Sequence, residues 1–157
     1  MAEACKKVDI SLEMLERSNP MMPATQSRVL MKGTMEKKGT GYLITYMEDI
    51  TDDHSSMTEV RMHVNDNRVM ILRSGEYSST FVFEDRLHYD TMYRTPFGDF
   101  PLSIHTTVLV NELTDEMGAI HVEYQVFMDG NPSFRIMNLM YQVEENGEYD
   151  PSERDEG

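Results

Sequence analysis

Residues 100–128, FPLSIHTTVLVNELTDEMGAIHVEYQVFM, decide the fold class. In both halves every second residue is apolar or Thr, which is the period of an extended strand with one buried face. Thr114 to Gly118 separate the halves and favour a turn, so an antiparallel hairpin is expected. The residues expected on its inner face are Leu102, Ile104, Thr106, Val108 and Val110, followed by Ile120, Val122, Tyr124, Val126 and Met128.

The same period recurs along most of the chain. Val8 to Leu15 alternates four times and favours a strand, although Val8, Leu12 and Leu15 also fit one face of a short helix. Gly33 lies inside another strand-like segment, where it suggests a bulge or a sharp bend. The ten segments that the pattern predicts as strands are 8–15, 26–36, 42–48, 58–64, 69–73, 77–83, 87–93, 100–110, 120–128 and 134–143.

Short connections between these segments determine the expected architecture. They imply antiparallel neighbours in a meander, and no segment shows a convincing amphipathic helix of three turns. A meander of this length must close on itself or split in order to protect its edges. We therefore expect an all-β fold, a closed antiparallel up-and-down barrel of 8–10 strands, with a two-sheet sandwich as the alternative. Residues 1–145 form the expected barrel domain, and residues 146–157 an acidic, disordered tail.

Composition excludes several classes of function. The 157 residues include 14 Lys plus Arg and 28 Asp plus Glu, which gives a formal charge of −14. That charge repels phosphate, so neither nucleic acid nor an anionic membrane is an expected partner. The single Cys5 cannot form an internal disulfide, and the chain opens with no secretory signal pattern. We therefore expect a soluble cytoplasmic protein, and its oligomeric state stays open.

Several short motifs, in this order and spacing, resemble the YwiB-like bacterial proteins, a domain of unknown function. The resemblance runs from about Lys7 to Glu145. It implies a barrel similar to the calycins, the group that includes lipocalins and fatty-acid-binding proteins, and it implies no established activity. The motifs are Tyr42-Leu43, Tyr46-x-Glu48, Arg73-Ser74-Gly75, Tyr93-x-Thr95-Pro96-Phe97-Gly98, Thr106, Gly118-x-Ile120-x-Val122-x-Tyr124 and Asn138.

A few polar residues fall on the expected inner face and are candidates for ligand binding. An Arg inside an apolar barrel is costly unless it is paired, so Arg73 needs Glu48, a ligand carboxylate, or a place at the rim beside a surface acid. The resemblance adds that fatty-acid-binding relatives hold a ligand carboxylate with a buried Arg and a Tyr. The candidate ligand-binding residues are Tyr46, Glu48, Arg73, Tyr93, Thr106, Tyr124 and Asn138.

Three functions remain in competition. The first is binding of a small, partly apolar ligand, with or without a carboxylate, inside the barrel. The second is a filled barrel that serves as a structural or protein-interaction module. The third is a small enzyme acting on an organic acid, with Glu48 as the acid or base and Tyr46 and Arg73 beside it. No cofactor and no metal are expected, because the five His residues lack a converging ligand pattern and no phosphate-binding loop is present.

Overall fold

The computed structural model describes residues 5–18, 21–49 and 57–144, and these form ten strands. The expected tail at residues 146–157 and most of the loop expected between residues 49 and 56 lie outside this part. No helix that could span a membrane occurs among the described residues. The strands are β1 (Cys5–Arg17), β2 (Thr25–Lys38), β3 (Gly41–Asp49), β4 (Met57–Asn65), β5 (Arg68–Ser74), β6 (Ser79–Glu84), β7 (His88–Thr95), β8 (Gly98–Leu113), β9 (Met117–Met128) and β10 (Asn131–Val143).

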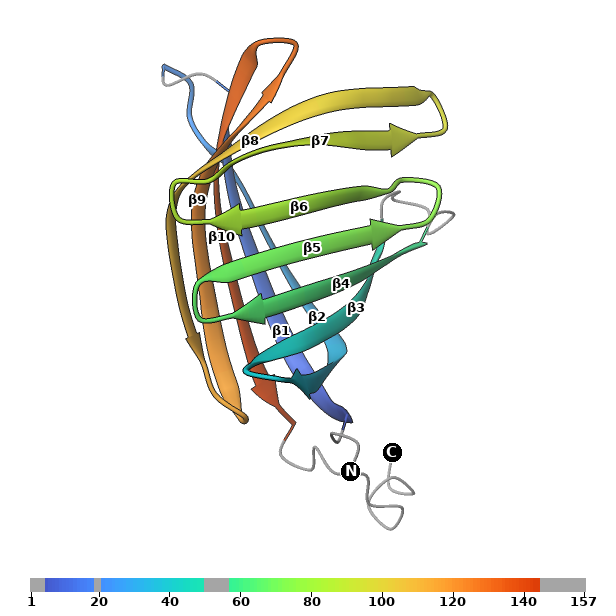
Figure 1. Ribbon diagram of the computed structural model, residues 1–157, viewed down its shortest axis with the longest axis vertical. Helices are drawn as coiled ribbons and strands as arrows, with labels where there is room; N and C mark the ends of the chain where they lie inside the picture. The colour runs from blue at the N-terminus through green and yellow to red at the C-terminus, as the bar shows by residue number, and fades with distance from the viewer. Residues whose placement is uncertain (1–4, 19–20, 50–56, 145–157) are drawn as a thin grey trace.

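The strands form one antiparallel meander that closes almost completely into a barrel (Figure 1). The first and last strands pair along their length, from Val8 opposite Val143 to Arg17 opposite Phe134. This ladder turns the ten-strand sheet, in the order β6-β5-β4-β3-β2-β1-β10-β9-β8-β7, into a ring. The expectation of an all-β up-and-down barrel of 8–10 strands is confirmed. Val8 to Leu15 belong to a strand, so the helical alternative is wrong.

One interruption of the ring lies between β6 and β7, two strands that are consecutive in sequence. Figure 1 shows these strands lying apart along their middles. A single bridge joins them at one end, where the backbones of Ser78 and Arg94 exchange two hydrogen bonds of 2.9 Å. At the other end the turn is closed by a 2.9 Å hydrogen bond from the Leu87 amide to the Glu84 carbonyl. We call this interruption the seam.

Alternation along each strand places one set of side chains inside the ring. β4 illustrates the pattern, because Thr58, Val60, Met62 and Val64 are buried while Glu59 and Arg61 between them are exposed. Burial of this set removes apolar surface from water and is the main force that favours the closed barrel. Its most deeply buried members are Val8, Ile10, Ile44, Val60, Met62, Val69, Ile71, Phe83, Ile104, Ile120, Val122 and Leu139.

A β-bulge in β8 overturns part of the expected inner face. The register against β9 shifts between Thr106 and Val108, so Thr107 is an extra residue without its own partner. Beyond the bulge the inward position passes to Leu109, which packs against the core, and Val110 is half exposed on the outside. The prediction that Val108 and Val110 face inward is therefore wrong, because one inserted residue exchanges the two faces of a strand.

Gly33 marks a place where three strands come very close together. It pairs with Val8 on one side and with Tyr46 on the other, and the β1–β2 register runs through it without a shift, so it is not a bulge. A Cβ at this position would lie 2.5 Å from the Thr45 carbonyl oxygen and 2.8 Å from Cδ1 of Ile10. Close backbone approach therefore requires Gly here.

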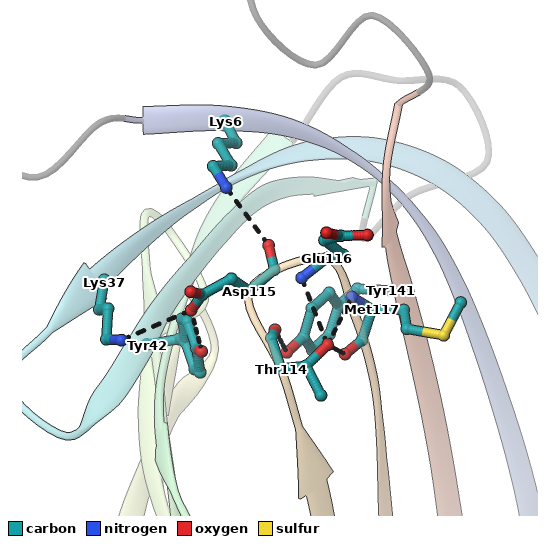
Figure 2. Close-up of polar contacts among 8 residues, drawn as sticks. All are labelled: Lys6, Lys37, Tyr42, Thr114, Asp115, Glu116, Met117 and Tyr141. Carbon is teal, nitrogen blue, oxygen red and sulfur yellow. Dashed lines mark hydrogen bonds and ion pairs between the residues drawn. The ribbon is translucent and has the colours of Figure 1, made fainter.

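The β8–β9 turn closes one end of the barrel, and we call this end the floor (Figure 2). The Tyr42 hydroxyl donates a hydrogen bond to the Asp115 carboxylate, which also lies 3.5 Å from Nζ of Lys37. The Tyr141 hydroxyl donates to the Thr114 carbonyl oxygen at 2.7 Å. These bonds join β3 and β10 to a turn that lies between them in space, and they hold the turn across the end of the barrel.

Replacing Gly33 with Val tests the close approach of β1, β2 and β3. The new side chain must displace the Thr45 carbonyl or Ile10, and overpacking of this kind lowers the free energy of unfolding by about 1–3 kcal/mol. Urea unfolding followed by circular dichroism measures the loss. Arg28→Val on the exposed half of the same strand is the control and changes stability by less than about 0.5 kcal/mol. Equal stability of the two variants would contradict the close approach.

Replacing Tyr42 with Phe tests the floor. The hydrogen bond from Tyr42 and then the charge of Lys37 hold the pKa of Asp115 below its ordinary value of 3.8. A lowered folded-state pKa stabilises the protein above the unfolded pKa, and this contribution is lost as the pH falls through the folded value. In Tyr42→Phe the pKa of Asp115, measured by carboxyl NMR titration, rises toward 3.8. Tyr141→Phe, whose hydroxyl bonds Thr114 instead, leaves the pKa of Asp115 unchanged.

Candidate functional site

A cavity of about 260 Å³ lies inside the barrel, toward the end opposite the floor. Residues of both strands that border the seam line it, together with residues of β1, β5, β8, β9 and β10. Its apolar wall includes Met14, Ile71, Phe81, Phe83, Leu102, Val126 and Met137. Its polar lining consists of Arg73, Tyr77, Ser79, Tyr93, Tyr124 and Arg135.

Arg73 enters the cavity from β5 and is paired with Glu48 of β3. The Nε atom of Arg73 donates to Oε1 of Glu48 at 2.9 Å, and the two side chains are 19% and 25% exposed. Tyr46, Val60 and Arg73 lie in one row across β3, β4 and β5, which brings Glu48, two residues beyond Tyr46, within reach of the guanidinium. Glu48 itself does not line the cavity.

This pairing keeps Arg73 charged. Burial by itself lowers the pKa of Arg73, but the charge of Glu48 and the hydrogen bond to it more than offset that effect, so the pKa is raised. The guanidinium carbon also lies 5.8 Å from the centre of the Phe81 ring, within the range of a cation–π contact. The bond to Glu48 uses Nε, and among the described residues the two terminal nitrogens of Arg73 have no hydrogen-bond partner, so they are available to water or a ligand.

Arg135 enters the cavity from β10 and has its own carboxylate partner. Its Nη2 donates to Oε2 of Glu16 at 3.3 Å, and its Nε donates to the Ser133 hydroxyl at 3.3 Å. Sequence reasoning missed Arg135 and Glu16. The signal was present, since Glu16 continues the inward alternation of β1 from Val8 and Arg135 shares its parity with Met137.

Three tyrosines add neutral donors to the lining. Tyr124 is buried, its ring centre lies 4.6 Å from that of Phe83, and its hydroxyl donates a weak 3.8 Å bond to Sδ of Met14. Burial raises the pKa of Tyr124, while Arg135 and Arg73 act in the opposite direction, so its hydroxyl is in electrostatic reach of both cations. Tyr77 and Tyr93 face each other beside the seam, 6.3 Å between ring centres.

Two predicted residues lie inside the barrel but not on the cavity wall. Tyr46 is buried, and desolvation raises its pKa to about 12, so its hydroxyl stays protonated. Thr106 is also buried, and its hydroxyl oxygen has no hydrogen-bond partner in the part of the chain that the structure describes. Arg73, Tyr93 and Tyr124 line the cavity, and Glu48 stands behind Arg73. Of the seven predicted residues, the structure thus brings four together.

Asn138 lies on the outer face, and the expectation that it faces inward is wrong. Its neighbours Met137 and Leu139 are the buried positions of β10, so Asn138 has the outward parity. Its amide contacts the ring of His121 on β9, and its amide nitrogen lies 3.5 Å from a carboxylate oxygen of Glu13 on β1. His121 therefore also lies on the outer face.

Another polar group on the outer face is too open to be a site. The Nε2 atom of His88 lies 3.0 Å from Oδ1 of Asp90 and 2.8 Å from Oγ of Ser103, and the Ser103 hydroxyl also donates directly to the Asp90 carboxylate, all on the outer side of the β7–β8 hairpin. No group of three His, Cys, Asp or Glu side chains able to hold a metal occurs among the described residues. The cavity is therefore the candidate site.

The fold and the cavity define a class: an antiparallel barrel with a small interior space lined by two cations and several phenols. A family model for a domain of unknown function, DUF1934, matches residues 17–143, and the chain belongs to that family. The crystal structure of the ywiB protein from Bacillus subtilis is similar, with a TM-score of 0.78 and 17% sequence identity over 90% of this chain and 95% of that one. At this identity the likeness shows the fold alone. No curated protein matches the sequence.

A double-mutant cycle tests the Arg73–Glu48 pair. Glu48→Gln leaves a largely buried guanidinium without its carboxylate and lowers the free energy of unfolding by about 1–3 kcal/mol. Adding Arg73→Met removes the unpaired charge, so the double variant is more stable than the sum of the single effects predicts. Asp99→Asn, which breaks the exposed Arg94–Asp99 pair, is the control and costs less than about 0.5 kcal/mol. Additive effects at Glu48 and Arg73 would contradict the pairing.

Proposed function

We propose that the barrel binds a compact, partly apolar molecule that carries a carboxylate. One observation carries the proposal: two arginines, Arg73 and Arg135, line one interior cavity while neither of their carboxylate partners does. The cations thus face the space, and Glu48 and Glu16 stand behind them. A cation that lines a cavity inside a protein favours binding of an anion in that cavity, because the low dielectric of the interior strengthens the attraction between the two charges.

The donors of the lining suit a carboxylate. The terminal nitrogens of Arg73 form a planar fork, which matches the two oxygens of a carboxyl group. Tyr93 and Tyr124 have raised pKa values, so at neutral pH each keeps its proton and donates to an acceptor. The apolar wall, with Phe81 and Phe83, would receive the remainder of the ligand.

The size of the cavity restricts the ligand. A volume of about 260 Å³ equals that of roughly nine water molecules in the liquid. It is also slightly below the range typical of drug-sized ligands, roughly 300–1,000 Å³. This supports a short aliphatic or aromatic acid and opposes a long-chain fatty acid.

The same small size favours the alternative, a filled barrel that serves as a structural module. Both arginines already have carboxylate partners, so the fold does not need a ligand to balance them.

We also propose that the protein is cytoplasmic, because the exposed thiol of Cys5 suits a reducing compartment. The formal charge of −14 supports partners other than nucleic acid or an anionic membrane.

Thermal shift and native mass spectrometry test the proposal with octanoate, 3-phenylpropionate and palmitate. At a hundredfold excess over Kd, a bound ligand raises Tm by about 5–10 °C. We expect this for octanoate or 3-phenylpropionate and not for palmitate. Arg73→Met and Arg135→Met each reduce the shift, and Arg94→Met, which removes an exposed arginine outside the cavity, preserves it.

Two results would contradict binding in the cavity. One is no shift with either short acid and no extra mass on the freshly purified protein, which would favour the filled barrel. The other is a shift that persists in both cavity variants, which would place the ligand elsewhere on the protein.

A further inference from the structure

Among the described residues, the first half of β2 has a neighbouring strand on one side only. Residues 25–32 pair with β1 on one side, from Thr25 opposite Glu16 to Lys32 opposite Asp9. On the other side β3 pairs with β2 only from Gly33 to Lys38. We call residues 25–32 the β2 edge.

Nothing in the described part of the chain covers this edge. No backbone hydrogen bond outside the β1–β2 ladder involves residues 25–32. Every one of these residues except the half-buried Met31 is exposed. The seam between β6 and β7 differs, because its two edges face each other and are bridged by Ser78 and Arg94. An open edge of eight residues offers a row of free N–H and C=O groups to another extended chain.

The side chains of the β2 edge indicate which kind of partner segment it could bind. Val29 is 49% exposed and Leu30 is 72% exposed, so the edge carries apolar surface. Its charged residues are Arg28 and Lys32, and residues 25–32 include no acid, in a chain with a formal charge of −14. Lys32 already contacts Asp9 and Glu144, whereas Arg28 has no hydrogen bond or ion pair among the described residues. The edge is thus basic and apolar within an acidic protein.

The alternation of the strand gives the pattern of the complementary segment. Arg28, Leu30 and Lys32 point to the outer face, and Val29 and Met31 have the opposite parity. A strand added here would set acids opposite Arg28 and Lys32 on the outer face. Its alternate residues would set apolar side chains beside Val29 and Met31.

We propose that the β2 edge binds an extended, acidic segment of a partner protein, which adds to the sheet as a further strand beside β2. Pairing with the same edge of a second copy is disfavoured, because two basic edges would face each other. Main-chain hydrogen bonds would supply the affinity, and Arg28 would supply the selection for acidic sequences.

A labelled nine-residue peptide in which Glu alternates with Val is the probe, and fluorescence polarisation measures its binding. We expect saturable binding that weakens as NaCl rises from 50 to 500 mM, because the attraction between exposed charges is screened. The same peptide with Lys in place of Glu does not bind. Hydrogen exchange on the complex shows new protection within residues 25–32, where an added strand would bond.

Arg28→Glu tests the selecting charge, with Arg61→Glu as the matched control. Arg61 is an exposed arginine on the outer face of β4, which has a strand on each side. Arg28→Glu weakens binding about fivefold or more at low salt, and Arg61→Glu changes it by less than about twofold. Equal binding of both peptides, equal effects of the two variants, protection outside residues 25–32, or association of two copies through this edge would overturn the proposal.

Discussion

The ladder between β1 and β10 is the contact on which the rest of the molecule depends. It joins the two ends of the meander, so one set of side chains becomes an interior and the other a surface. Without that ladder the sheet would divide into β1–β6 and β7–β10, with β1 and β10 as two further long edges and the apolar face exposed to water. At the seam, β6 and β7 are joined at one end by the turn between them. At the other end they are joined by the backbone bridge between Ser78 and Arg94, so the two strands stay together without a ladder.

Closure also explains why charged groups can stay inside. Arg73 and Arg135 come from strands on different parts of the ring, and each reaches the cavity with a carboxylate behind it. At the floor the exposed Asp115 likewise has partners on other elements, since it accepts a hydrogen bond from Tyr42 and lies 3.5 Å from Nζ of Lys37. Arg73 and Arg135 thus each have an opposite charge on another strand, which offsets the cost of removing them from water.

Much of this arrangement could be predicted from the sequence, and the failures have definite physical causes. The period of two gave the ten strands and the inward positions of Thr106 and Tyr124. One inserted residue at Thr107 exchanged the faces beyond it, so Val110 was misplaced. Asn138 was placed on the wrong face although Met137 and Leu139 beside it carry the apolar signal. Its outward contacts with His121 and Glu13 come from neighbouring strands, and alternation along one strand does not reveal them.

The sequence by itself determined the fold class, because alternation and short turns act between residues close together in the chain. It also determined that Arg73 needs a partner, since an unpaired charge inside a barrel is too costly. Only the tertiary structure decided that Glu48 is that partner and that Arg135 shares the cavity, because both facts depend on how distant strands are placed. It also decided where β3 leaves β2, and therefore which eight residues form an open edge.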